Sequence, residues 1–294
     1  MNISVIGGGK WGQALHFAFS QNHKSIITSR TKKDVANFVS LEEALSNKYV
    51  VIALPAQIVG EWLKQNFRYN NQKVLIAAKG IEASSGRFLN EIFSDFVPTE
   101  SLAYLSGPSF AAEVMKALPT ALVVSSKNKD MAKEFCAFFP NFIKSYADDD
   151  IVGAEVSGAY KNVLAIASGV CDGLELGLNA RASLIARGLV EMQRFGLSFG
   201  AKEAAFLGLS GAGDLFLTAS SVLSRNYRVG VALAKGMKLD EILKELGEVA
   251  EGVLTSRAIS KISKERNIYT PIAREVSLII EGKSPLESLK DLLA

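Results

Sequence analysis

The stretch ISVIGGGKWG (residues 3–12) decides the fold of this chain. It joins a short apolar run to a cluster of glycines, and a helix-like run follows directly from Trp11. Gly7, Gly9 and Gly12 have the spacing G-x-G-x-x-G between a strand and a helix. The first glycine allows a tight turn, the second lets the backbone approach a pyrophosphate, and the third lets the helix pack close to the strand. This pattern predicts a dinucleotide-binding turn, and the alternative is a glycine-rich turn without a ligand.

The first half of the chain repeats this alternation of short apolar runs with amphipathic stretches. Several runs are apolar at consecutive positions, which is typical of strands buried on both faces of a parallel sheet. The alternation predicts an α/β N-terminal Rossmann domain with a doubly wound, mainly parallel sheet. The six runs are ISVIG (3–7), SIIT (25–28), YVVIAL (49–54), KVLIAA (73–78), LAYLS (102–106) and ALVVS (121–125).

The character of the sequence changes after the acidic triplet at 148–150. From there the apolar positions recur at intervals of three and four residues, as in Val156, Tyr160, Val163 and Leu164. We therefore expect an all-α C-terminal domain. The predicted boundaries are 1–150 for the dinucleotide-binding domain and 151–294 for a helical substrate-binding and catalytic domain.

Composition excludes several classes of protein. The 294 residues carry 33 Lys and Arg against 30 Asp and Glu, a net charge of +3, so no basic patch indicates a nucleic-acid partner. No apolar run approaches the roughly 18 residues of a membrane span. The N-terminus lacks the pattern of an export signal, so we expect a cytoplasmic protein. With only two histidines and two cysteines, we expect no metal site and no histidine-based catalytic triad.

The second apolar run bears on the choice of cofactor. An NAD-preferring site usually has Asp or Glu about 20 residues after the glycines, where it accepts from the ribose 2′-hydroxyl. Here SIIT is followed by Ser29, Arg30, Thr31, Lys32 and Lys33. Because Arg30 can bind a 2′-phosphate, the sequence favours NADP(H), with NAD possible. The alternative is that these are solvated surface cations.

Lys161 is the candidate for proton transfer. It lies in the helix-like stretch SGAYKNVLAIASGV (157–170), which is too apolar for an ordinary surface lysine. A buried lysine is either paired or neutral, and both states suit a proton-transferring group. The alternative is a lysine whose stem lies along an amphipathic helix while its ammonium reaches water.

A second polar cluster lies in the stretch 208–230. Asp214 follows a Gly-Ala-Gly turn, and Ser224, Arg225 and Asn226 offer a hydroxyl, a guanidinium and an amide in succession. These groups can bind a phosphate monoester, because Arg forms a planar fork and the neighbours add neutral donors. The alternative is that Ser-Arg-Asn is only a helix cap.

Eight segments, in order over nearly the whole chain, resemble bacterial NAD(P)-dependent glycerol-3-phosphate dehydrogenases. They are GGGKWG (7–12), AAKGIE (77–82), GPSFAAE (107–113), GAYKNVLAIASG (158–169), LNARASLIARGL (178–189), GLSGAGDLFLT (208–218), SRNYRVG (224–230) and VAEGVLT (249–255).

The resemblance implies reversible reduction of dihydroxyacetone phosphate to sn-glycerol 3-phosphate with NAD(P)H, which supplies glycerol phosphate for phospholipid biosynthesis. It also implies a homodimer, and it makes Lys161 the proton acceptor in oxidation and the donor in reduction. The residues implied for the substrate are Lys79, Gly107, Ser109, Lys161, Asp214, Ser224, Arg225 and Asn226. Those implied for the dinucleotide are Trp11, Arg30, Lys79, Ala111, Arg225, Val249 and Glu251, besides Gly7, Gly9 and Gly12 of the turn.

Three positions depart from the common family pattern, and two other functions stay open. Lys10 stands where a small Ser or Ala is usual, Ala56 stands where a hydroxyl residue is frequent, and Tyr227 follows SRN at a position that varies. One alternative is a dehydrogenase of the same two-domain plan that acts on a hydroxy acid or a ketopantoate-like substrate and binds a carboxylate. The other is a dinucleotide-binding sensor without catalysis, which the presence of Lys161 disfavours.

Overall fold

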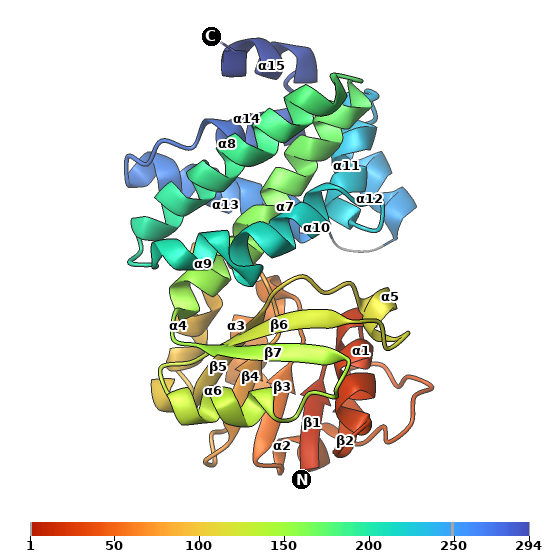
Figure 1. The fold of residues 1–294 in the computed structure, drawn as a ribbon. Coiled ribbons are helices and arrows are strands. Elements are labelled where there is room, and N and C mark those ends of the chain that lie inside the picture. Colours follow the sequence, from red (N-terminus) through yellow and green to blue (C-terminus); the bar gives the residue numbers. More distant parts are fainter. Residues whose placement is uncertain (1, 248–249, 294) are drawn as a thin grey trace. The chain divides into compact units, whose positions relative to one another are not determined.

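The computed structural model describes residues 2–247 and 250–293. Contacts divide the chain into two compact units, Met1–Lys79 with Arg87–Glu155 and Gly80–Gly86 with Val156–Ala294. The first unit is built on a seven-stranded sheet and the second is helical (Figure 1). The predicted fold class is thereby confirmed. The division at 150/151 into domains with separate functions stays a prediction.

The sheet of the first unit has the order β2-β1-β3-β4-β5-β6-β7. The pairs from β2 to β5 and the pair β6–β7 are parallel, and only β5–β6 is antiparallel. The strand order reverses between β1 and β3, so their carboxyl ends form the switch point where open α/β sheets bind ligands. The strands are β1 (Asn2–Ile6), β2 (Lys24–Thr28), β3 (Tyr49–Ile52), β4 (Lys73–Ile76), β5 (Leu102–Ser106), β6 (Thr120–Ser125) and β7 (Ile143–Asp148).

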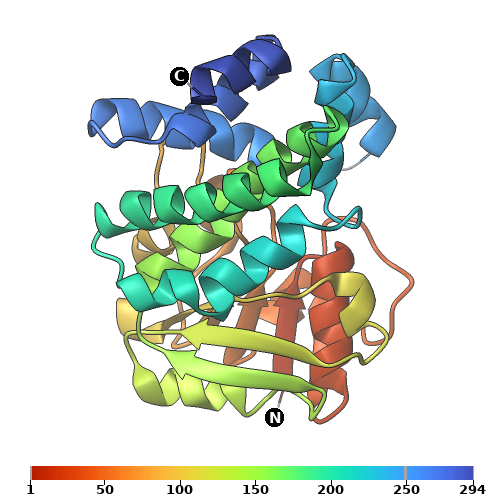
Figure 2. The ribbon, with the colours of Figure 1, turned by 45° about the horizontal axis from the view of Figure 1, so that its top comes forward.

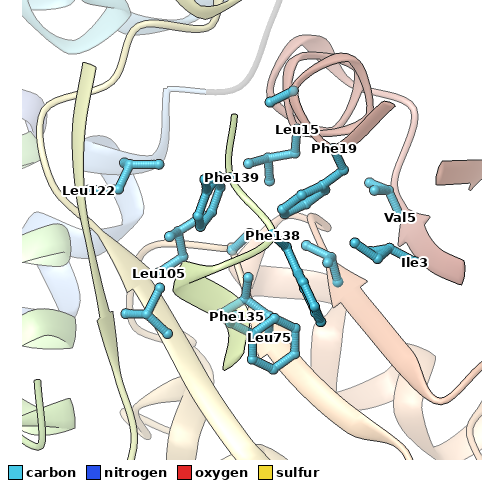
Figure 3. Packing of buried hydrophobic residues seen from close by; sticks show 14 of the residues in the cluster. Ile3, Val5, Leu15, Phe19, Leu75, Leu105, Leu122, Phe135, Phe138 and Phe139 are labelled. Carbon is cyan, nitrogen blue, oxygen red and sulfur yellow. The ribbon is translucent and has the colours of Figure 1, made fainter. Parts of the chain in front are cut away.

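Helices cover both faces of this sheet, as the consecutive apolar residues predicted. One core includes Val51 and joins Leu75 to α1 and α6 (Figure 3) and also to α5. The other core joins Val50 and Ile52 to α2, α3 and α4. Figure 2 shows α5 beside α1, and both contribute to the first core. The helices of this unit are α1 (Lys10–Ser20), α2 (Leu41–Leu45), α3 (Ala56–Asn66), α4 (Leu89–Ser94), α5 (Ala111–Val114) and α6 (Lys129–Cys136), with a 3₁₀ turn η1 (Thr99–Ser101).

One strand, β7, was missed by the sequence pattern. Its sequence IKSYAD is polar or exposed at most positions, because β7 lies at the edge of the sheet. An edge strand that is only partly covered does not need a continuous apolar run.

The second unit contains helices and no strand among its described residues. Its longest helix, α7 (Ile151–Gly173), begins in the first unit and carries Lys161. The helices that follow are α8 (Gly177–Leu197), α9 (Glu203–Leu207), α10 (Asp214–Ala219), α11 (Arg225–Ala234), α12 (Leu239–Leu246), α13 (Glu251–Glu265), α14 (Pro271–Ile280) and α15 (Pro285–Leu293), with the π-helical turn η2 (Leu209–Gly213) between α9 and α10.

Candidate functional site

The glycine-rich turn lies at the carboxyl end of β1, at the switch point of the sheet. Gly7 has φ +125°, and a Cβ there would lie 2.4 Å from the Ala53 carbonyl oxygen. A Cβ on Gly12 would lie 1.9 Å from the Gly7 carbonyl oxygen. A side chain fits at neither position, so the tight turn and the close helix require glycine.

Gly9 differs from its neighbours because the space beside it is open. A Cβ at Gly9 would have no atom within 4 Å, and this residue is the N-cap of α1. No side chain of the described residues caps α1, and its first turn holds no acidic residue. The Gln13 side chain fixes the turn by donating to the Gly8 carbonyl at 2.9 Å. An open surface at a helix N-terminus fits the pyrophosphate of a dinucleotide.

Trp11 is placed beside this turn by a hydrogen bond. Its indole Nε1 donates to the Ala77 carbonyl oxygen at 3.1 Å, which ties α1 to the residue that follows β4. The indole is half-buried. Trp11 therefore supports the wall of the turn, and its predicted contact with the dinucleotide stays a prediction.

Arg30 is exposed on the loop that follows β2. In the part of the chain that the structure describes, no ion pair engages its guanidinium. The loop is held at Ala36, whose carbonyl oxygen lies 3.0 Å from Nε2 of His16. Burial lowers the pKa of His16, although the bond to Ala36 opposes this shift. A neutral imidazole with a proton on Nε2 can donate to that carbonyl.

Lys79, Gly107 and Ser109 come together in the first unit. The Gly107 carbonyl oxygen accepts from Ser109 Oγ at 3.1 Å and from Lys79 Nζ at 3.5 Å. Gly107 has φ +108°, and a Cβ there would lie 3.0 Å from the Ala121 carbonyl oxygen. Ala111, two residues after Ser109, is the first residue of α5. The Gly107 carbonyl thus brings together the Ser109 hydroxyl of GPSFAAE and the Lys79 ammonium of AAKGIE.

Lys161 is buried in the second unit and is paired. Its Nζ lies 2.6 Å from Asp214 Oδ1 and 3.1 Å from Thr218 Oγ1. The side chains of Lys161 and Asp214 are only 8% and 1% exposed. The alternative of a lysine that reaches water is therefore wrong, because Nζ ends among buried polar groups. The sequence left two states open for a buried Lys161, one paired and one neutral. In the structure Lys161 is paired with Asp214.

Asp214 reaches this position through a tight turn. The π-helical turn η2 ends at Gly213, and Asp214 is the first residue of α10. A Cβ on Gly211 would lie 2.3 Å from the Phe206 carbonyl oxygen, so only glycine lets η2 pack against the end of α9. The glycines of GLSGAGD therefore fix the position at which α10 begins, and with it the position of Asp214.

Thr218 is the polar group that sequence reasoning missed. Its Oγ1 lies 3.4 Å from Asp214 Oδ1 and within reach of Lys161 Nζ. The signal was present, because residues four apart lie on the same face of a helix. It could be used only once Asp214 was known to point toward Lys161.

The Ser-Arg-Asn cluster begins α11. Ser224 is the N-cap, and its Oγ accepts from the Tyr227 amide at 3.3 Å. Asn226 is buried, and its Oδ1 accepts from the Gly252 amide at 3.0 Å, which leaves the amide nitrogen of the side chain as a donor. Arg225 is exposed. The helix-cap interpretation of Ser224 is correct, and its hydroxyl hydrogen still allows it to donate.

The remaining predicted residues, Val249 and Glu251, precede Gly252 in the sequence. Glu251 is the first residue of α13 and is half-buried, whereas Val249 lies outside the described residues. The described chain has no group of three or more His, Cys, Asp or Glu side chains that could hold a metal ion. No helix within the described ranges is long and apolar enough to cross a membrane.

Comparisons with known proteins agree along the whole chain. Family models described as the N-terminus and the C-terminus of NAD-dependent glycerol-3-phosphate dehydrogenase match residues 21–132 and 150–291. A glycerol-3-phosphate dehydrogenase [NAD(P)+] of Sulfurimonas denitrificans is 61% identical over 292 residues, which are 99% of each chain. One of Campylobacter jejuni subsp. doylei is 61% identical over 293 residues, covering 100% of this chain and 99% of that one. The crystal structure of glycerol-3-phosphate dehydrogenase from Coxiella burnetii superposes with a TM-score of 0.91 at 30% identity, covering 99% of this chain and 98% of that one.

Proposed function

Because the chain belongs to the NAD-dependent glycerol-3-phosphate dehydrogenase family, we propose that it reversibly reduces dihydroxyacetone phosphate to sn-glycerol 3-phosphate with NAD(P)H. The observation that carries this proposal is the buried contact of Lys161 with Asp214 and Thr218. A proton donor in a buried polar cluster is what the reduction of a carbonyl requires besides a hydride.

The dinucleotide is proposed to bind to the first unit. The pyrophosphate fits the open surface at Gly9 and the N-terminus of α1. When it is bound, the nicotinamide supplies or accepts the hydride. Arg30 is exposed on the loop that follows β2, where residues 29–33 include no carboxylate, and this supports a preference for NADPH over NADH. Lys79 and Ala111 are further proposed contacts.

Lys161 is proposed to hold the proton that the substrate oxygen gains on reduction and to take it back on oxidation. Asp214 compensates the charge of the buried ammonium, and Thr218 fixes its direction with a second hydrogen bond. Two hydrogen bonds to side chains of α10 restrict Nζ to one place, which orients the proton toward the reacting oxygen.

The substrate phosphate is proposed to bind at the start of α11. Arg225 offers an exposed guanidinium, Ser224 a hydroxyl and Asn226 a side-chain amide. The N-terminus of this ten-residue helix adds a favourable dipole. Lys79, Gly107 and Ser109 are proposed to bind the other polar groups of the substrate.

The decisive experiment follows the loss of reduced-nicotinamide absorbance with dihydroxyacetone phosphate. It is run in parallel with NADPH and with NADH, and dihydroxyacetone serves as the substrate that lacks the phosphate. Turnover that requires the phosphate supports the proposal, and the ratio of the two cofactors tests the role of Arg30. A folded protein that turns over a hydroxy or keto acid instead would favour the carboxylate-binding dehydrogenase, and one that binds the dinucleotide without turnover would favour the sensor.

The cellular setting is also part of the proposal. The product would supply the glycerol phosphate of phospholipids, and the enzyme would act in the cytoplasm as a homodimer. The exposed side chains of Leu178, Val190 and Leu197 on α8 support self-association, because they leave apolar surface on one helix. Light scattering coupled to size exclusion tests the dimer, and a mass of one chain would exclude it.

A further inference from the structure

Helix α11 lies directly against the backbone of α7 in the second unit. A Cβ on Gly169 of α7 would lie 2.0 Å from the Tyr227 carbonyl oxygen, and a Cβ on Gly230 of α11 would lie 2.0 Å from the Ile166 carbonyl oxygen. These two glycines let the helices touch without side chains between them. The same helix α7 carries Lys161 about two turns before Gly169. The start of α11 is therefore held close to the helix of the proposed proton donor.

A hydrogen-bonded group of three side chains joins the same two helices to α8. Tyr227 of α11 donates through its hydroxyl to Asp172 Oδ2 of α7 at 2.6 Å. Arg181 of α8 donates to the same oxygen through Nη1 at 2.7 Å. All three side chains are half-buried. Burial, followed by the bond to the Asp172 carboxylate, raises the pKa of Tyr227, so its hydroxyl keeps the proton that it donates.

Tyr227 belongs to the turn that holds the proposed phosphate ligands. Its backbone amide donates to Ser224 Oγ, and it directly follows Arg225 and Asn226 in the chain. The close contacts at Gly169 and Gly230 set the distance between the two helices, but they are van der Waals contacts and contain no directional bond. A directional bond from Tyr227 to a carboxylate that Arg181 already orients supplies this missing restraint.

We propose that Tyr227, Asp172 and Arg181 are positioning residues for the substrate phosphate: they lock the first turn of α11 in the orientation in which Ser224, Arg225 and Asn226 bind it. This inference rests on the proposed function. None of the three touches the reacting atoms in this assignment, so they set substrate affinity and leave proton transfer to Lys161.

The test compares Tyr227→Phe, Asp172→Ala and the double variant by steady-state kinetics with dihydroxyacetone phosphate and with dihydroxyacetone. Removing the hydroxyl should raise KM for dihydroxyacetone phosphate about five- to tenfold with little change in kcat, the loss expected of a hydrogen bond to a charged group. The kcat/KM for dihydroxyacetone should stay within about twofold, because that substrate has no phosphate to place. The double variant should be no worse than Asp172→Ala, because both changes break one contact.

Tyr49→Phe is the matched control. Tyr49 also donates its hydroxyl to a carboxylate, that of Glu134, but it lies at the amino end of β3 in the first unit. This variant loses the same kind of bond and should keep the wild-type KM. Thermal unfolding of all variants is recorded, and Asp172→Asn, which keeps an acceptor for Tyr227, should recover part of the affinity.

The outcomes separate this inference from the proposed function. If the wild type shows no preference for the phosphorylated substrate, the proposed function itself fails. If the wild type has that preference and Tyr227→Phe behaves like Tyr49→Phe, the positioning role is wrong. Equal losses in kcat/KM for both substrates would show a general structural role and would also overturn it.

Discussion

Lys161 Nζ and Asp214 Oδ1 lie 2.6 Å apart, although 53 positions separate them in the sequence. Both side chains are buried, so neither charge can be hydrated as it would be at the surface. Removing a charge from water costs several kcal/mol, and a partner at hydrogen-bond distance offsets much of this cost. Removing one partner would therefore leave an uncompensated buried charge, and the proposed proton transfer depends on the same pair.

Lys161→Ala tests this dependence. Turnover of dihydroxyacetone phosphate should fall by about 10²- to 10⁴-fold, the contribution of a positioned proton donor, while NADPH titration gives a Kd near that of the wild type. The variant also leaves Asp214 unpaired, so the free energy of unfolding should fall by about 3–5 kcal/mol. Lys161→Ala combined with Asp214→Asn should regain part of this stability and none of the activity. Near-normal turnover in the single variant would remove Lys161 from the mechanism.

Thr218→Val tests the second bond to the ammonium. Valine has nearly the shape of threonine, so the main effect of the variant is that the buried Lys161 ammonium loses the hydroxyl as a hydrogen-bond partner. Because Thr218 Oγ1 lies 3.1 Å from Lys161 Nζ, we expect kcat to fall about tenfold with KM for dihydroxyacetone phosphate little changed. Thr218→Ser keeps the hydroxyl and should recover most of the rate. A Thr218→Val enzyme with unaltered kcat would exclude this role.

Two glycine substitutions separate binding from folding in the turn. Gly9→Ala places a methyl group in open space, so the thermal midpoint should stay near that of the wild type while the Kd for NADPH rises about tenfold or more. Gly12→Ala places a methyl group 1.9 Å from the Gly7 carbonyl oxygen, so the thermal midpoint should fall and the Kd for NADPH should rise. Fluorescence titration with NADPH and thermal unfolding measure the two effects. Tight NADPH binding by Gly9→Ala would argue against a pyrophosphate at this surface.

Arg30→Ala tests the preference for NADPH. The Kd for NADPH should rise at least about tenfold more than the Kd for NADH, because only NADPH has the 2′-phosphate that the guanidinium can bind. Lys24→Ala, an exposed cation at the other end of β2, is the control and should leave both constants unchanged. Equal weakening of both cofactors by Arg30→Ala would exclude the 2′-phosphate role.

Glu155→Gln should change how stability depends on pH. Burial raises the pKa of Glu155 well above its ordinary value, despite the hydrogen bond from the Asn90 amide at 2.7 Å. A carboxyl whose pKa is raised in the folded state stabilises fully below its unfolded pKa of about 4.3, and this stability is lost as the pH rises toward the folded pKa. The amide does not titrate and keeps the acceptor oxygen.

The thermal midpoint of Glu155→Gln should therefore exceed that of the wild type at pH 8, and the difference should shrink toward pH 5. Glu100→Gln, at an exposed position, is the control and should follow the wild type at every pH. If Glu155→Gln were less stable than the wild type at pH 8, the conclusion that the charged, buried carboxylate of Glu155 destabilises the folded protein would be wrong.

The sequence by itself determined the features that depend on neighbouring residues. The positive φ of Gly7 and the lack of room at Gly12 follow from a fixed spacing of glycines between a strand and a helix. The consecutive apolar residues of β3 and β4 predicted strands covered on both faces, which the two cores confirm. The apolar residues around Lys161 in its helix likewise predicted that its side chain is buried, and it is.

Tertiary structure alone decided which distant groups meet. The pairing of Lys161 with Asp214 and Thr218, and that of Tyr227 with Asp172, join helices whose relative rotation no local pattern specifies. Strand β7 was not predicted because a strand at the edge of a sheet does not need a continuous apolar run. The antiparallel pairing of β6 with β5 was not predicted either, because no local sequence pattern indicates it. Periodicity records which face of an element is buried, whereas its partners depend on the packing of the whole unit.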